Sequence, residues 1–250
     1  MDDHGLWALL LGVLGLVFGS FIATVVLRWP LEKSALEGRS YCDACGRRLR
    51  AHELVPVFSY LVQRGRCRSC GATIDTTHLL IELAAMLVGV CAGVAAPGVE
   101  GAAGAGFGWL LLALAALDLT LFWLPNSLTG ALAATGFAAG MIGIAPPLAD
   151  RVAGGAAGFL ALWLVAALYR RARGRMGLGG GDPKLFGAIG LWLGWRALPP
   201  VLLIACVMGL CLVLAMRIAG REVRATDRLP FGVMLAAAAW MAWLASALAP

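Results

Sequence analysis

This chain has few charged residues. Charged residues make up 14% of its 250 positions, whereas soluble globular domains carry roughly 25%. This shortage excludes a soluble domain of the same length. Hydrophobic residues fill 61% of the chain, and its mean hydropathy is +0.85. Most of this apolar surface must therefore lie in lipid.

Polar interruptions are also rare over long distances. Several apolar stretches reach about 18 residues or more, which is enough to cross a bilayer core of roughly 30 Å as a helix. The sequence therefore predicts an all-α polytopic membrane protein with about eight transmembrane helices. These are expected at 5–27, 78–97, 106–123, 126–145, 149–169, 184–198, 199–217 and 230–249.

Basic residues are scarce outside three segments. The segments 28–68, 170–184 and 217–228 hold 18 of the 20 Lys and Arg residues. Because short cytoplasmic loops carry excess Lys and Arg, we expect these segments to be cytoplasmic and both termini to lie outside. The net charge of +6 then reflects topology. It favours membrane lipids with anionic headgroups as partners and excludes nucleic acid.

Two CxxCG motifs interrupt the apolar pattern. Their four cysteines, in pairs separated by 21 residues, are Cys42, Cys45, Cys67 and Cys70. Gly46 and Gly71 permit a left-handed turn after each pair, so that four thiolates can surround one tetrahedral Zn(II). Disulfides or a redox motif are the alternatives, which a cytoplasmic location and the duplication disfavour. Four thiolates leave no open position, so the zinc is expected to be structural.

Ionisable residues are almost absent from the predicted spans, and Asp118 is the exception. No other charged residue lies between Glu100 and Asp150. A lone carboxylate in a membrane is costly, so it should face protein or water and have a function. We expect it about 10 Å inside the cytoplasmic boundary. The alternatives are a structural pair with an Arg, or a hydrogen bond to Thr120 or Ser127.

A second carboxylate, Asp182, follows three glycines. The simple interpretation is a helix N-cap with proline at the next position. Capping does not require Gly179, Gly180 and Gly181, whereas the close approach of a substrate backbone does. No β-strand precedes these glycines, so a nucleotide-binding loop is disfavoured. Lys184 either keeps a neighbouring carboxylate charged or extends to the interface.

Two carboxylates on different spans, both at the cytoplasmic end, suggest a reaction. When they approach each other, one keeps a proton. The ionised partner can activate water while the protonated one polarises a scissile carbonyl. This is aspartyl-protease chemistry, and Asp118 and Asp182 are the predicted catalytic residues.

Several segments together resemble the type IV prepilin peptidases, which are GxGD membrane aspartyl proteases. They are "GSFIATVVLRWP" (19–30), the cysteine segment (42–74), "DLTLFWLPNSLTG" (118–130), "GLGGGDPKLFGAIGLWLGW" (177–195) and "LPFG" (229–232). Ala23 stands where the family usually has Asn, and Asn126 where an Asp is common.

The resemblance implies cleavage of the basic leader of prepilins or pseudopilins, for a type IV pilus or type II secretion. The reaction would occur at the cytoplasmic face of a bacterial inner membrane. It also implies N-methylation of the new terminus with S-adenosylmethionine, for which Glu53 and Glu82 are candidate cation contacts. We expect a first helix (1–27), a zinc-binding domain (28–77) and a membrane protease domain (78–250). A peptidase without methylation and a proton-coupled transporter remain as alternatives.

Overall fold

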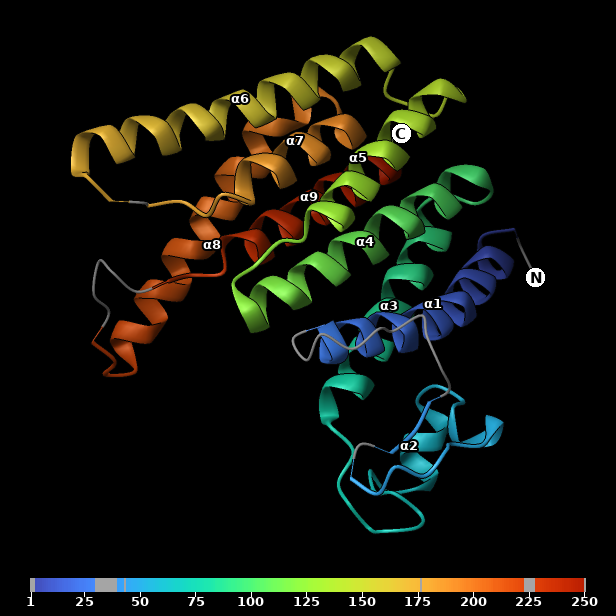
Figure 1. Ribbon diagram of the computed structural model, residues 1–250. Helices are drawn as coiled ribbons and strands as arrows, with labels where there is room; N and C mark the ends of the chain where they lie inside the picture. Colours follow the sequence, from blue (N-terminus) through green and yellow to red (C-terminus); the bar gives the residue numbers. More distant parts are fainter. Residues whose placement is uncertain (1–2, 30–39, 43, 176, 223–227, 250) are drawn as a thin grey trace. The chain divides into compact units, whose positions relative to one another are not determined.

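The computed structural model describes residues 3–29, 40–42, 44–175, 177–222 and 228–249. Parts of the predicted zinc-binding domain (30–39 and 43) and of the third basic segment (223–227) lie outside the described residues. Within them the chain is helical, and only two isolated β-bridges occur. The prediction of an all-α protein is confirmed. The helices, labelled in Figure 1, are α1 (Asp3–Arg28), η2 (Ala51–Glu53), α2 (Phe58–Val62), α3 (Thr76–Ala95), α4 (Val99–Leu121), α5 (Asn126–Met141), α6 (Leu148–Arg173), α7 (Asp182–Leu193), η3 (Trp195–Ala197), α8 (Leu198–Ile218) and α9 (Phe231–Leu248).

All eight predicted spans are found as helices, but two of them are short. Among the described residues, six helices are long and apolar enough to cross a membrane. The other two, α5 and α7, have 16 and 12 residues, or about 24 and 18 Å of rise. Six helices thus have the length and apolarity of a full span, two fewer than the eight expected. The reason is local, because α5 ends at Met141, before Gly143 with a φ of 82°, and α7 stops before Gly194, whose φ is 75°.

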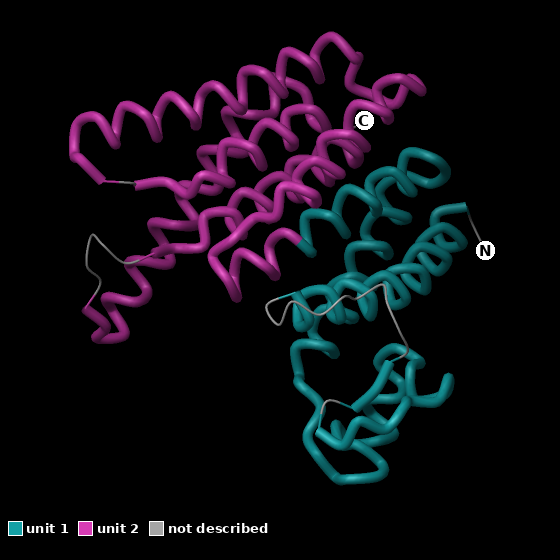
Figure 2. The backbone as a smooth tube through the Cα atoms, viewed as in Figure 1, with its two compact units in different colours: residues 1–113 teal, residues 114–250 magenta. Residues whose placement is uncertain are grey.

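The chain forms two compact units, Met1–Ala113 and Leu114–Pro250, and the boundary falls inside α4 (Figure 2). Each unit has its own helix packing. The three-part division expected from the sequence stays a prediction, because it divides the chain by function and not by compactness.

In the first unit, α1 and α3 run antiparallel. The Nδ1–H of His4 donates to the carbonyl of Val94 at 2.9 Å, near the start of α1 and the end of α3. Further along, a Cβ added to Gly19 would lie 2.7 Å from the Cα of Glu82. Small residues let two membrane helices approach this closely. The two helices are therefore held in one register along their length.

In the second unit, α7 is enclosed by its neighbours. It packs against α5, α6 and α9 (Figure 1), and Leu185 and Ile189 have no exposed surface. A Cβ added to Gly158 of α6 would lie 2.8 Å from the carbonyl oxygen of Phe186, so α6 and α7 nearly touch through their backbones. The C-termini of α4, α6 and α8 and the N-termini of α5, α7 and α9 thus lie at one end, which carries both aspartates.

The opposite end of this unit is held by a buried arginine. Arg151 has 1% of its surface exposed, and its guanidinium donates five hydrogen bonds of 2.8–3.1 Å, all to backbone carbonyls. The acceptors are the carbonyls of Gly136, Ile144, Ala145, Pro146 and Leu191. One side chain thereby joins α5, the α5–α6 connection and α7.

Candidate active site and metal centre

Asp118 lies near the end of α4 and contacts the start of α9. The helix ends at Leu121, three residues later, so Asp118 is about 4.5 Å along the axis from the helix end. Its side chain is buried, with 6% exposed. Its Oδ2 accepts a hydrogen bond of 3.1 Å from the amide of Val233. That amide belongs to the first turn of α9, where backbone donors have no helical partner.

The contact with the Val233 amide is neither of the structural alternatives for Asp118, which were a pair with an arginine and a hydrogen bond to Thr120 or Ser127. Among the described residues, the one ion pair joins Arg47 and Glu53, so Asp118 has no arginine partner there. The hydroxyl of Thr120 donates to the carbonyl of Ala116 at 2.8 Å. The carboxylate therefore accepts from the backbone at the start of α9.

Asp182 is the first residue of α7 and is 5% exposed. Its Oδ2 accepts a hydrogen bond of 3.0 Å from the amide of Gly179, which precedes the helix. Gly181 occupies the N-cap position, and no side chain caps the helix there. The N-cap interpretation of Asp182 was wrong, because the carboxylate orders the glycine loop and not the helix.

The segments that carry the two aspartates converge in the second unit. Leu124 lies between the segments that carry them. A Cβ on Gly181 would lie 2.8 Å from the Cβ of Leu124, and one on Gly232 would lie 3.2 Å from its Cδ1. The end of α4, the start of α7 and the start of α9 thus converge on one side chain.

Glycines surround both carboxylates. A Cβ on Gly179 would be 2.9 Å from the Oδ2 of Asp182, and one on Gly232 would be 2.8 Å from the Oδ2 of Asp118. Gly180 differs, because no atom lies within 4 Å of its Cβ position. The site's own packing therefore requires Gly179 and Gly181, while Gly180 faces open space. Gly232 was not predicted as a site residue, although it follows a proline at the start of an apolar run.

A cavity of about 290 Å³ adjoins the glycine loop. One wall is a face of α6 that includes Phe159 and Trp163, and the other includes Gly179, Gly180 and Lys184. The Nζ of Lys184 donates to the Oδ1 of Asn126 at 2.7 Å. Lys184 therefore links the start of α7 to the start of α5, a role that neither interpretation from the sequence included.

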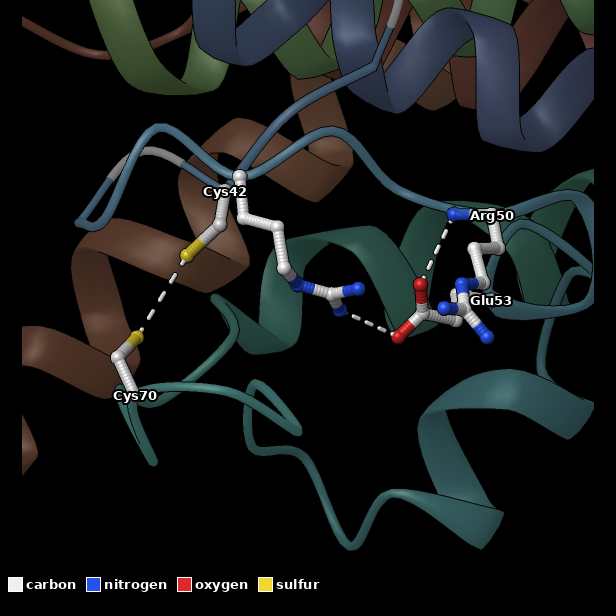
Figure 3. Close-up of polar contacts among 5 residues, drawn as sticks. Cys42, Arg50, Glu53 and Cys70 are labelled. Atoms are coloured by element: carbon white, nitrogen blue, oxygen red, sulfur yellow. Dashed lines mark hydrogen bonds and ion pairs between the residues drawn. The ribbon is translucent and has the colours of Figure 1, made fainter.

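The four cysteines of the paired motifs form one cluster. Their sulfur atoms all lie within 4.8 Å of one another, and the Sγ atoms of Cys42 and Cys70 are 3.9 Å apart (Figure 3). A tetrahedral zinc with Zn–S bonds of about 2.3 Å places its sulfurs roughly 3.8 Å apart. The geometry therefore fits one tetrahedral metal ion.

The two motifs have the same backbone structure. The amide of Gly46 donates to the carbonyl of Cys42 at 2.8 Å, and that of Gly71 to Cys67 at 2.9 Å. Both glycines have a positive φ, 68° and 71°, as the spacing predicted. The backbone amide of Cys70, followed by that of Ser69, lowers the pKa of Cys67 to about 6, which favours the thiolate that a metal binds.

Comparison with known proteins places these features in a family. The family model described as "Bacterial Peptidase A24 N-terminal domain" matches residues 13–95, and that of the "Type IV leader peptidase family" matches residues 105–214. A Burkholderia pseudomallei relative is 42% identical over 252 residues, which cover 90% of this chain and 81% of the relative. The chain belongs to the type IV leader peptidase family.

Other relatives have the same name. A Klebsiella pneumoniae protein is 40% identical and covered over 91% of its length, with 80% of this chain aligned. An Aeromonas hydrophila protein is 35% identical, with 96% of this chain and 92% of the relative aligned. All three are called "Prepilin leader peptidase/N-methyltransferase". No solved structure matches the chain. The predicted family is confirmed, and the transporter alternative has no support.

The two candidate cation contacts are already engaged within the first unit. Glu53 accepts hydrogen bonds from the guanidinium of Arg47 at 2.6 Å and from the amide of Arg50 at 2.9 Å (Figure 3). Arg47 first, and then the Arg50 amide, lower the pKa of Glu53 to about 2. Glu82 accepts from the amide of Val57 at 2.7 Å. Both glutamates thus organise the polar segment, a role that the sequence did not predict.

Proposed function

We propose that this protein cleaves the leader peptide of type IV prepilins or pseudopilins with Asp118 and Asp182, and N-methylates the new terminus. The observation that carries the proposal is the convergence of two buried carboxylates, each held by one backbone amide, in a member of the leader peptidase family. Neither is neutralised by a cation among the described side chains. Both therefore keep the freedom to exchange protons.

One carboxylate of the pair can act as general base and the other as general acid. One carboxylate is ionised and takes a proton from water as its oxygen attacks the scissile carbonyl. The other is protonated and donates a hydrogen bond to the carbonyl oxygen, where negative charge develops. The leaving amine then receives a proton from the pair. Since the two groups are coupled, these roles belong to the pair and not to one residue.

The flanking elements position substrate and carboxylates. The exposed Gly180 leaves room for an extended peptide backbone beside Asp182, and the cavity next to it can take an apolar side chain of that peptide. Gly179, Gly181 and the Lys184–Asn126 hydrogen bond fix the loop that carries Asp182. Uncharged atoms around the pair exclude cations that would hold both groups ionised.

The cysteine cluster would bind one Zn(II) through Cys42, Cys45, Cys67 and Cys70 as a structural ion. When bound, S-adenosylmethionine supplies a methyl group on a sulfonium to the free amine of the cleaved product. The name of the relatives and the presence of this cysteine module support methylation. The module and the aspartate pair belong to different compact units, so the two activities should separate.

Location and partners follow from the charges. In the second unit, the basic residues of the α6 and α8 C-termini lie at the end that carries the aspartates. We propose that this end and the cysteine module face the cytoplasm from a bacterial inner membrane. The prepilin leader and anionic lipids would meet the protein there. Nucleic acid is not a proposed partner.

The test is substitution of each aspartate by asparagine. Asp118→Asn and Asp182→Asn keep the side-chain size but remove the ionisable group. Either change should reduce cleavage of a purified prepilin by about 10³-fold or more, and the double variant should lose little further activity, because groups acting as a unit are non-additive. Methylation of an already cleaved substrate should continue. Full cleavage by either variant would refute the two-aspartate mechanism.

A further inference from the structure

The short helix α2, in the polar segment, has exposed apolar side chains. Among the described residues of 40–75, the exposed large hydrophobic side chains all lie on or next to α2. They are Leu54, Val55, Phe58, Leu61 and Val62, with 42–64% of their surface exposed. Phe58, Leu61 and Val62, at i, i+3 and i+4, share one face of α2, and Leu54 and Val55 lie in the bend just before that helix. We refer to these five residues as the α2 face.

The polar residues of the same helix point the other way. Ser59 and Tyr60 are half-buried, and a Cβ on Gly65 would lie 2.8 Å from the Tyr60 hydroxyl oxygen. A small water-soluble domain would turn its apolar face inward. The α2 face is therefore arranged for an apolar environment outside the protein.

Glu82 determines where this face lies along the membrane helices. The start of α2 is joined to α3 by the hydrogen bond from the Val57 amide to Glu82. Gly19 of α1 lies opposite Glu82, and His4 lies opposite Val94 at the other end of the pair. Fifteen residues separate His4 from Gly19, or about 22 Å of helix rise. Glu82 lies six residues after Thr76, the first residue of α3, which is about 9 Å of rise, so the start of α2 lies beside the N-terminal end of this membrane helix.

The backbone enforces this placement. Val57 has a φ of 60°, which is a genuine outlier for a β-branched residue and persists only where its surroundings require it. Its amide is bound by the buried carboxylate of Glu82, 6% exposed. The chain thus turns sharply beside α3, and α2 follows directly after this turn.

The arginines near the α2 face indicate what this face contacts. Exposed arginines border the α2 face in the sequence: Arg48, Arg50, Arg64 and Arg66. An apolar helix face bordered by basic residues is the pattern of an element lying in an anionic lipid interface. We propose that the α2 face inserts into the lipid leaflet at the α3 N-terminal end and anchors the cysteine module to the bilayer.

The test places an environment-sensitive fluorescent amino acid at position 58 of the full-length chain in phosphatidylglycerol-containing nanodiscs. Lipids brominated on their acyl chains quench a fluorophore that touches them. Position 210 on α8, where Leu210 is 69% exposed, is the lipid-contact control. Position 68, in the second cysteine motif, is the aqueous control. We expect quenching at 58 to exceed that at 68 at least threefold and to be strongest with bromines near the headgroup.

A second experiment does not depend on the label. Phe58→Ser/Leu61→Ser changes two exposed side chains, so the module should retain its metal and its thermal stability in detergent. In nanodiscs, protease cleavage within 40–75 should become at least several-fold faster. Quenching at 58 equal to that at 68 would overturn the proposal. So would a blue-shifted but unquenched signal, because it would mean that protein, from this chain, a second copy or a substrate, covers the face.

Discussion

Gly232 offers the sharpest test of how the site is assembled. In Gly232→Ala, the new methyl would start 2.8 Å from the Oδ2 and 3.0 Å from the Cγ of Asp118. Ordinary non-bonded contacts with carbon are roughly 3.5 Å, so Asp118 or α9 must move by about 0.7 Å. A displacement near 1 Å can cost about 10²-fold in rate. We therefore expect cleavage to fall about 10- to 100-fold.

Loss of the fold would not explain such a result. Ala is favoured over Gly in a helix by up to about 1 kcal/mol, so the substitution supports α9 where it does not clash. Gly130→Ala is the matched control, since Gly130 lies in α5 of the same unit and no atom lies within 4 Å of its Cβ position. It should cleave normally.

The assay is cleavage of a purified prepilin by both variants in the same lipid, with thermal unfolding measured in parallel. Methylation of a precleaved substrate should stay near its normal rate in both, because the cysteine module lies in the other unit. Equal cleavage by Gly232→Ala and Gly130→Ala would refute the argument that the α9 terminus positions Asp118.

Three further predictions concern the rest of the chain. Arg151→Met should lower the unfolding free energy by on the order of 3 kcal/mol, since five backbone carbonyls lose their donor and one of these hydrogen bonds is fully buried; an unchanged melting temperature in detergent would contradict this. Cys67→Ser should remove about one equivalent of zinc by metal analysis and leave cleavage largely intact, whereas metal-free wild-type protein would refute the metal site. A cysteine at Val99, in a chain whose native cysteines do not react with the label, should react only from outside the cell, and one at Arg221 only from inside; the reverse pattern would overturn the orientation.

The sequence predicted those features that single residues or regular spacings reveal. Apolar runs located all eight helices, and the isolation of Asp118 in such a run singled it out as a candidate catalytic residue. The CxxCG spacing placed four sulfurs around one point, as the cluster confirms. Helix length was less predictable, because the turns after Met141 and at Gly194 decide where α5 and α7 stop, and hydropathy does not.

Contacts between distant segments and backbone groups could not be predicted. The Val233 amide and Asp118 are 115 positions apart, and a backbone donor leaves no mark in a sequence. The same applies to Arg151, whose acceptors are all carbonyls. Likewise α2, with five residues, is too short for its periodicity to stand out within a polar segment.

The buried arginine also bears on how the chain enters the membrane. Four of the five carbonyls that Arg151 binds lie between Gly136 and Pro146, and the fifth, that of Leu191, comes 40 residues after it. The α5–α6 hairpin therefore contains nearly all the acceptors its cation needs before α7 has been synthesised. A cation that would resist transfer into lipid alone can enter with four of its five hydrogen bonds already made within this pair of helices. The later arrival of α7 then completes the last bond and brings Asp182 to its position.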